Sequence, residues 1–378
     1  MLSLRSGMKM HSSHFRIPAV TAAVLLASDI SGAASAANVE LYGSIDNGLR
    51  VTAARGIDGA SSQTTVGMES GQWFPNLIGL KGSESLGNGY SVAFSLENRF
   101  NSDSGTFLEE GRLFDNQALL MVNTEKWTVA AGRMEGLSST MGEFDLMCPM
   151  EPFEGGWAEA GGGNVFANIG LSANNAVAAR VRPIAGLTVT GAYSLGVETE
   201  KPGFSAKRHY AAIGSSYQND RLWAGFTYEV LTKGDAASKN DHVFKAGVNY
   251  DFGPVRAFIA YSYTKNHTWW GVNSDSNSYM LGFTAPAAGG LIRTSVQYFD
   301  GKSVKLADGT DFNADRTVAS IGYTYPVSKR TTLWGVYSYS HGSKSLNRNS
   351  KSGYTMASTE ERAEANRSLV SLGVTHFF

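Results

Sequence analysis

The sequence has few charged residues, a single cysteine and little proline. Charged residues make up 17% of the 378 positions, below the roughly 25% usual for soluble domains. The 32 basic and 33 acidic residues nearly cancel, so no nucleic-acid partner is expected. The one cysteine, Cys148, excludes a disulfide framework and any multi-cysteine metal site. A soluble enzyme of one or two domains is still open at this point.

The sequence also lacks the run of about 20 apolar residues that a membrane-spanning helix needs. Its longest apolar stretch, Ile17–Ala27, follows Arg5, Lys9 and Arg16. Small residues come next and end in Ala-Ser-Ala at positions 34–36. This three-part order predicts a secretory signal peptide over residues 1–36. The mature chain, residues 37–378, is then either soluble after export or a membrane β-barrel.

What the chain does have is hydrophobic alternation with a period of two. In 242–252, five apolar or aromatic side chains at even positions alternate with Lys245, Gly247, Asn249 and Asp251. Segments 187–196, 221–230 and 292–298 alternate in the same way. Such alternation predicts strands whose two faces meet different environments.

Short turns and long polar loops alternate between these segments. Turns are expected at 86–89, 124–126, 184–186, 219–220, 253–254, 287–290 and 327–330. Longer loops are expected near 54–71, 101–110, 135–172, 197–205, 234–240, 266–274, 302–312 and 342–364. This pattern predicts an all-β fold, a sixteen-stranded antiparallel transmembrane β-barrel. A secreted β-sandwich or propeller is the alternative, but aromatics near strand ends, such as Tyr337 and Tyr339, favour the barrel.

Several motifs, in order from the first strand to the last, resemble the general porins of Gram-negative bacteria, proteobacterial type. They are VELYGSID at 39–46, LKGSESLGNG at 80–89, FSLENRF at 94–100, AGR at 131–133, SKRTTLWGVYSY at 328–339 and GVTHFF at 373–378. The alternating last strand ending in Phe378 is also typical of outer-membrane barrels. The resemblance implies a homotrimer in the Gram-negative outer membrane, in contact with lipids and lipopolysaccharide. It also implies that the third extracellular loop folds into the pore and narrows it.

The proposed third loop, 135–172, is rich in acids and contains no Lys or Arg. We expect its acids to face the pore constriction, with Glu135, Glu143, Asp145, Glu151 and Glu154 as the candidates. The resemblance places basic residues on the opposite wall, and alternation nominates Arg50, Lys81, Arg99 and Arg133. Opposed charges across a narrow water-filled waist orient dipolar solutes and bias ion choice.

The sequence departs from the family pattern at two places on this wall. Asn116 stands where the family usually has a basic residue in the fourth strand, and Ala178 does so in the sixth, with Arg180 and Arg182 further along. The wall is therefore less basic than is typical, and the preference for anions or cations stays open.

No catalytic or metal-binding motif is evident. The histidines of the mature chain have no metal-ligand spacing, and no G-x-S-x-G element occurs. A barrel-type enzyme would need a Ser/His or Asp/His set at the rim, and we expect neither an enzyme nor a cofactor. The sequence therefore predicts passive diffusion of small hydrophilic solutes and ions, with a sugar- or anion-selective channel as the alternative.

Overall fold

A computed structural model gives the fold of the protein. It describes residues 38–55, 63–157, 160, 166, 172–197, 208–233, 239–269, 272–305, 309, 311–312, 314–342 and 366–378. The signal peptide predicted for residues 1–36 lies outside these ranges. No helix among the described residues is long and apolar enough to cross a membrane.

Most of the described residues lie in one antiparallel sheet. Its long strands are β1 (Asn38–Arg55), β2 (Gln63–Ser70), β3 (Asn76–Gly87), β4 (Tyr90–Asn101), β6 (Gln117–Asn123), β7 (Trp127–Glu135), β8 (Ser172–Val181), β9 (Leu187–Ser194), β10 (Tyr210–Gln218), β11 (Leu222–Leu231), β12 (Asp241–Asp251), β13 (Arg256–Trp269), β14 (Val272–Ala287), β15 (Gly290–Gly301), β18 (Asp315–Pro326), β19 (Thr331–Gly342) and β20 (Asn366–Phe377). Short strands β5 (Thr106–Phe107), β16 (Val304–Lys305) and β17 (Asp311–Phe312) lie in the loops. Both β2 and β3 pair with β1, so together they form one interrupted strand and the barrel has the predicted sixteen.

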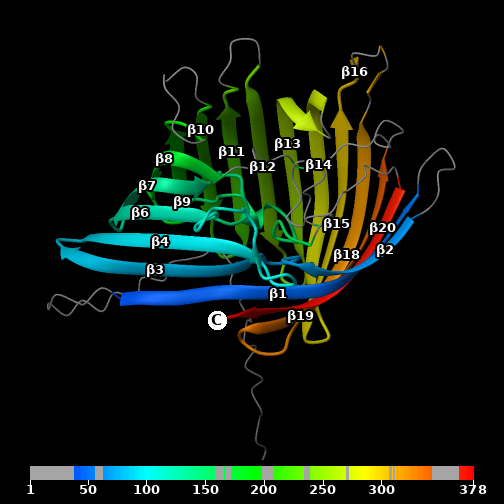
Figure 1. Cartoon of the computed structure of the whole chain (residues 1–378), viewed down its shortest axis with the longest axis horizontal. Coiled ribbons are helices and arrows are strands. Elements are labelled where there is room, and N and C mark those ends of the chain that lie inside the picture. The colour runs from blue at the N-terminus through cyan, green and yellow to red at the C-terminus, as the bar shows by residue number, and fades with distance from the viewer. Residues whose placement is uncertain are drawn as a thin grey trace, which may run out of the picture.

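The sheet closes where the last strand meets the first. β20 pairs with β1 from Ser44 opposite Phe377 to Arg55 opposite Asn366. Gly43 and Phe378 then exchange both backbone hydrogen bonds, each 3.1 Å long. Figure 1 shows β20, in red, running beside β1 and β2, in blue. Closure pairs the first barrel strand with the last, and spanning lipid with strands requires such a closed sheet. Among the described residues, β2 pairs with β1 alone.

The connections agree with the sequence at the turns and differ at two loops. All seven predicted tight turns join consecutive strands. The loop predicted at 54–71 instead contains β2, which pairs with β1 from Asn47 to Ala54. The loop predicted at 266–274 is a continuation of the β13–β14 hairpin, which pairs up to Trp269 and Val272. Both predictions were wrong because polar residues there extend the ladder beyond the apolar alternation.

The two faces of the sheet differ as the alternation predicts. On β14, β15 and β18 the outward residues Leu281, Val296 and Ile321 are more than half exposed. Inward neighbours such as Ser278 and Gln297 are fully buried. A water-filled interior and a lipid-facing exterior require this division.

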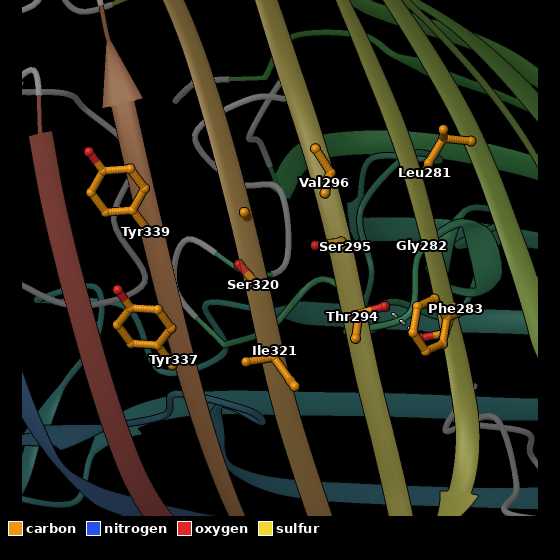
Figure 2. Close-up of a pocket in the computed structure, with 11 residues that line it drawn as sticks. Leu281, Gly282, Phe283, Thr294, Ser295, Val296, Ser320, Ile321, Tyr337 and Tyr339 are labelled. Atoms are coloured by element: carbon orange, nitrogen blue, oxygen red, sulfur yellow. Dashed lines mark hydrogen bonds between the residues drawn. The ribbon is translucent and has the colours of Figure 1, made fainter.

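A shallow groove of about 490 Å³ crosses the exterior of β14, β15, β18 and β19. Its walls are outward apolar and aromatic side chains, including Leu281, Phe283, Ile321, Tyr337 and Tyr339. Figure 2 shows them on the same side of the four strands. The groove therefore belongs to the lipid-facing surface and lies outside any route through the barrel.

Candidate functional site

The segment after β7 folds against the inward face of the barrel. We call residues 136–160 the inner loop, of which the structure describes 136–157 and 160. At its start, Leu137 and Phe144 are buried in a cluster with the inward residues Leu119 and Ala178. In Figure 1 its blue-green trace lies within the ring of strands.

The inner loop continues around the wall over two further apolar clusters. Met147 and Met150 pack with Trp223 and Val243 of β11 and β12. A short 3-10 turn, Cys148–Met150, lies at this point. Further on, Phe153 and Trp157 pack with the inward residues Trp334 and Val336 of β19 and Leu369 of β20. The loop thus contacts the wall from β6 to β20.

Wall side chains also hold the loop by its backbone. They donate to successive carbonyl oxygens of the loop: Lys245 Nζ to Ser138 at 3.2 Å, Arg180 Nη2 to Glu143 at 2.5 Å, Asn249 Nδ2 to Pro149 at 2.7 Å, Arg293 Nη1 to Pro152, and Gln297 Nε2 to Ala160 at 2.7 Å. These donors come from β8, β12 and β15. The loop has no regular sheet partner, so such bonds satisfy backbone acceptors that burial would otherwise leave unpaired.

Glu143 lies between a wall cation and a wall amide. Its carboxylate lies 3.7 Å from the Arg180 guanidinium, and its backbone N–H donates to Gln117 Oε1 at 3.1 Å. Burial raises the pKa of Glu143 to about 6, against the lowering effects of Arg180, Arg182 and Lys81. Glu143 therefore titrates close to neutral pH.

Asp145 and Glu151 have more local roles. The Asp145 carboxylate accepts the backbone N–H of Met147 at 2.8 Å and of Cys148 at 3.1 Å, which stabilises the turn that follows. Burial raises the pKa of Asp145 to about 7 and that of Glu151 to about 8, where Lys245 is the main opposing charge. Burial, and then the Asp145 charge, also raise the pKa of Cys148, so its thiol has little thiolate character.

The remaining two acids bond to wall arginines. Glu154 lies 3.2 Å from Arg293 on β15. Glu135, at the end of β7, lies 3.4 Å from Arg99 and accepts the Ser172 hydroxyl at 2.7 Å. Glu135 and Arg99 thus form an ion pair that joins one of the predicted acids to one of the predicted bases.

The other predicted bases contact acids outside the inner loop. Arg50 lies 3.4 Å from Glu69 of β2, and Lys81 lies 3.3 Å from Glu40 of β1. The Lys81 ammonium is 4.7 Å from the centre of the Tyr42 ring. Lys81 keeps 29% of its side chain exposed, more than any of the other three predicted bases.

Arg133 contacts the backbone at the strand ends. Its guanidinium donates to the carbonyls of Asp115 and Ser172 at 2.8 and 2.9 Å, and to Asn174 Oδ1 at 2.6 Å. It also lies 3.0 Å from Glu109. A bulge between Gly132 and Met134 shifts the register at this point, so simple alternation does not fix the direction of this side chain.

Three wall cations that contact the inner loop were absent from the predicted set. They are Arg180, Lys245 and Arg293. Alternation places Lys245 and Arg293 on the polar faces of their strands, and that signal was available in the sequence. Their partners in the loop could not be read from it, because strand order around the barrel decides which wall residues the loop meets.

An Asp/His pair at the strand ends was also missed. His267 Nδ1 lies 2.8 Å from an Asp241 carboxylate oxygen, and Lys233 lies 3.9 Å from the same carboxylate. His267 is on β13 and Asp241 begins β12, while Lys233 lies two residues beyond β11. No group of three or more potential metal ligands occurs among the described residues.

A family model for Gram-negative porins matches residues 19–345, which is most of the chain. The chain belongs to the Gram-negative porin family. It is an outer-membrane porin, and the barrel described above is the fold of this family.

Curated relatives and solved structures support the assignment to the porin family. The porin is 28% identical to an outer membrane porin protein of Bordetella pertussis, covering 84% of this chain and 92% of that protein. It is 26% identical to outer membrane porin protein 32 of Delftia acidovorans, covering 81% and 84%. Among solved structures, the anion-selective porin from Comamonas acidovorans matches with a TM-score of 0.71 at 21% identity, covering 91% of this chain and all of that one.

The departures from the family pattern now have a structural reason in this porin. Ala178 is buried in the cluster that holds Phe144, and the Phe144 ring lies 4.8 Å from the Arg180 guanidinium carbon. A long basic side chain at 178 would compete with Phe144 for that space. At the other departure, Asn116 Nδ2 donates to the buried Glu97 carboxylate at 2.5 Å, and the neighbouring Gln117 accepts the Glu143 N–H.

Proposed function

We propose that the porin forms a water-filled channel for passive diffusion of small hydrophilic solutes and ions, narrowed by the inner loop. The observation that carries the proposal is the set of contacts between the inner loop and inward residues from β6 to β20. A loop attached in this way occupies much of the interior cross-section. The passage is then left beside β1, β3 and β4, where Lys81 is partly exposed.

Charges of both signs border this passage. Glu143 lies on the loop side, and Lys81 and Arg182 are near enough to influence its ionisation. An arrangement of this kind sets up a transverse field that orients dipolar solutes and gives apolar solutes no compensating partner. It acts on the rate of entry of a solute and requires no chemistry, so we propose a channel without enzymatic activity.

Planar-bilayer recording of the purified protein tests the proposal. We expect stable conductance steps that grow in proportion to salt concentration, as free ion diffusion through water requires. A protein that inserts but gives no steps would contradict the channel itself. Saturable block by one sugar would replace general diffusion by a substrate-selective channel.

A preference for anions is the second candidate. Among the loop acids, Glu135, Glu143 and Glu154 contact arginines and Asp145 bonds to its own turn. Besides Arg180, the positive charges that act on Glu143 are Lys81, which also lies 3.3 Å from Glu40, and the exposed Arg182. The solved porin from Comamonas acidovorans is anion-selective. Reversal potentials in a salt gradient decide this point.

We also propose a homotrimer embedded in outer-membrane lipid and lipopolysaccharide, reached by export through the signal peptide at residues 1–36. The porin family assignment and the lipid-facing exterior support this assembly. Conductance increments in groups of three, together with cross-linking in native membranes, test the trimer. Amino-terminal sequencing of the membrane-extracted protein tests cleavage after Ala36.

A further inference from the structure

The interrupted strand β2–β3 bulges out of register with β1 between Ser70 and Leu77. On β1, Asn47 and Ser44 are three residues apart. Their partners on the neighbouring strand, Ser70 and Leu77, are seven residues apart. Four residues are therefore extra. We call residues 71–75 the inner bulge, and its Trp73 is buried with Trp157 and Trp334 in one cluster.

The carboxylate of Asp46 organises the inner bulge. Asp46 is fully buried and accepts the backbone N–H groups of Gln72 at 2.7 Å and of Trp73 and Phe74 at 3.4 Å. It also accepts Trp334 Nε1–H at 3.1 Å and the Thr375 hydroxyl. One side chain of β1 thus bonds to the bulge, to β19 and to β20.

The far end of the inner loop lies on this bulge. The Trp157 N–H donates to the Gln72 carbonyl at 2.5 Å. The Trp157 ring lies 5.5 Å from Trp73 and 5.4 Å from Trp334, between ring centres. A Cβ at Gly156 would overlap the carbonyl of Trp73, so only glycine permits this approach.

The backbone of the loop end is held in a conformation that side-chain-bearing residues rarely adopt. Glu154 has φ 56° and Trp157 has φ 69°. Such positive φ values persist only where surrounding contacts fix them. At Trp157 those contacts are the bulge carbonyl and the two indole rings, and at Glu154 the contact is Arg293.

We propose that the inner bulge is a dock that fixes the far end of the inner loop, and that Asp46 is the positioning residue that shapes it. This inference rests on the proposed function, in which the inner loop narrows the channel. The first part of the loop follows directly from β7, but its far end needs an attachment of its own. The dock provides it, and so helps to set the size limit of the channel.

Gly156→Ala tests the dock, because the added methyl meets Trp73 while every barrel strand keeps its sequence. Gly67→Ala on β2 is the matched control, since the nearest atom to a Cβ there is 4.0 Å away. The measurement is the ratio of disaccharide to monosaccharide entry into liposomes containing each protein. We expect Gly156→Ala to raise this ratio about twofold or more, since selectivity follows pore diameter, and Gly67→Ala to leave it unchanged.

Asp46→Asn tests the positioning residue by replacing one of its acceptor oxygens with a donor. If Asp46 acts through the dock, the double variant Asp46→Asn/Gly156→Ala shows the same entry ratio as Gly156→Ala alone, as coupled sites do. Additive effects would overturn that role. Trp157→Ala gives an independent loss of the dock if Asp46→Asn fails to fold.

The outcomes separate the dock from the channel. Wild-type protein without conductance steps would remove the proposed function. Wild-type steps combined with unchanged entry ratios and unchanged open-channel noise in both Gly156→Ala and Trp157→Ala would overturn the dock alone.

Discussion

At the scale of single residues, the acids of the inner loop divide by their contacts. Asp145 bonds to its own turn and Glu154 to Arg293. Glu143 combines a long contact with Arg180 and a pKa of about 6. The pKa of Asp145 is also raised, to about 7, but its carboxylate bonds to its own turn, whereas Glu143 lies beside Arg180 of the wall.

The first prediction concerns the pH dependence of ion selectivity. The raised pKa means that Glu143 is ionised above about pH 6 and neutral below it. A unit charge at about 8 Å in water is worth about 0.5 kcal/mol. Loss of this charge favours anions and disfavours cations by that amount each, so we expect the anion-to-cation permeability ratio, from reversal potentials, to rise about fivefold as pH falls from 7.5 to 5. Glu143→Gln should have a higher ratio already at pH 7.5 and a weaker pH dependence, of which Asp145 and Glu151, with pKa values of about 7 and 8, keep a part. An unaltered titration in that variant would count against Glu143.

The second prediction concerns Lys81, which faces the passage with its side chain partly exposed. Lys81→Gln removes one positive charge and should lower the anion-to-cation permeability ratio by about fivefold, by the same Coulomb estimate. Reversal potentials at fixed pH measure it. Lys302→Gln is the control, because Lys302 is bonded to Asp275 beyond the end of β15. Equal effects of both substitutions would indicate a general surface-charge effect.

The sequence predicts which side chains of this site face the interior, but not which residues they contact. Alternation correctly identifies the polar face that carries Lys81, Lys245 and Arg293. It does not give partners, because Arg293 meets Glu154 across a sequence distance of 139 residues. Nor does it give the direction of Arg133, where a bulge shifts the register.

At the scale of strands, outward residues at different positions along a strand lie at different depths in the membrane. Leu281 on β14 lies six residues before Ala287 at the turn, about half of the 9–11 residues that cross a bilayer. Leu333 lies close to the β18–β19 turn, since β19 begins at Thr331. Both are outward and exposed, so they differ mainly in depth.

The third prediction uses this difference. Leu281→Arg should lower the free energy of unfolding in vesicles by about 2–4 kcal/mol, and Leu333→Arg by about 0–1 kcal/mol, because the cost of a lipid-facing charge falls toward the interfaces. Urea titration of the refolded protein measures both values. Equal losses at the two positions would mean that the membrane is centred elsewhere on the barrel.

Strand positions were predictable where lipid imposes a pattern, and less so beyond it. The seven tight turns all occur as predicted because each interrupts a clear alternation. The upper β13–β14 hairpin carries Asn266 and Asp275, joined at 2.9 Å, and its side chains are polar on both faces. Backbone pairing continues there without the hydrophobic signal, so the sequence suggested a loop.

At the scale of the whole molecule, closure brings together strands from opposite ends of the chain. Gly43 lies at this seam, where a Cβ would overlap both the Leu77 carbonyl and the Phe378 ring. The seam therefore has no room for an added methyl group at Gly43. At Gly191 on β9, the nearest atom to a Cβ is 3.8 Å away.

The fourth prediction tests the seam. Gly43→Ala should reduce the free energy of unfolding by about 1–3 kcal/mol, as overpacking does. Gly191→Ala should stay within about 0.5 kcal/mol of the unmodified protein. Denaturant titrations monitored by electrophoretic mobility of heated and unheated samples measure both. A stable Gly43→Ala barrel would show that β1 and β20 can separate without loss of fold.

The inner bulge has one further consequence, which concerns hydration. It lies opposite Ser44–Asn47, near the middle of β1, at a height where the exterior of the barrel faces hydrocarbon. Peptide groups released from the ladder at that height have no water outside to bind, so an outward bulge would leave them dehydrated. The bulge must turn toward the aqueous side, and the Asp46 carboxylate takes the place of solvent there. The low polarity of the bilayer thus requires the inner bulge to point into the barrel, where it contacts the inner loop.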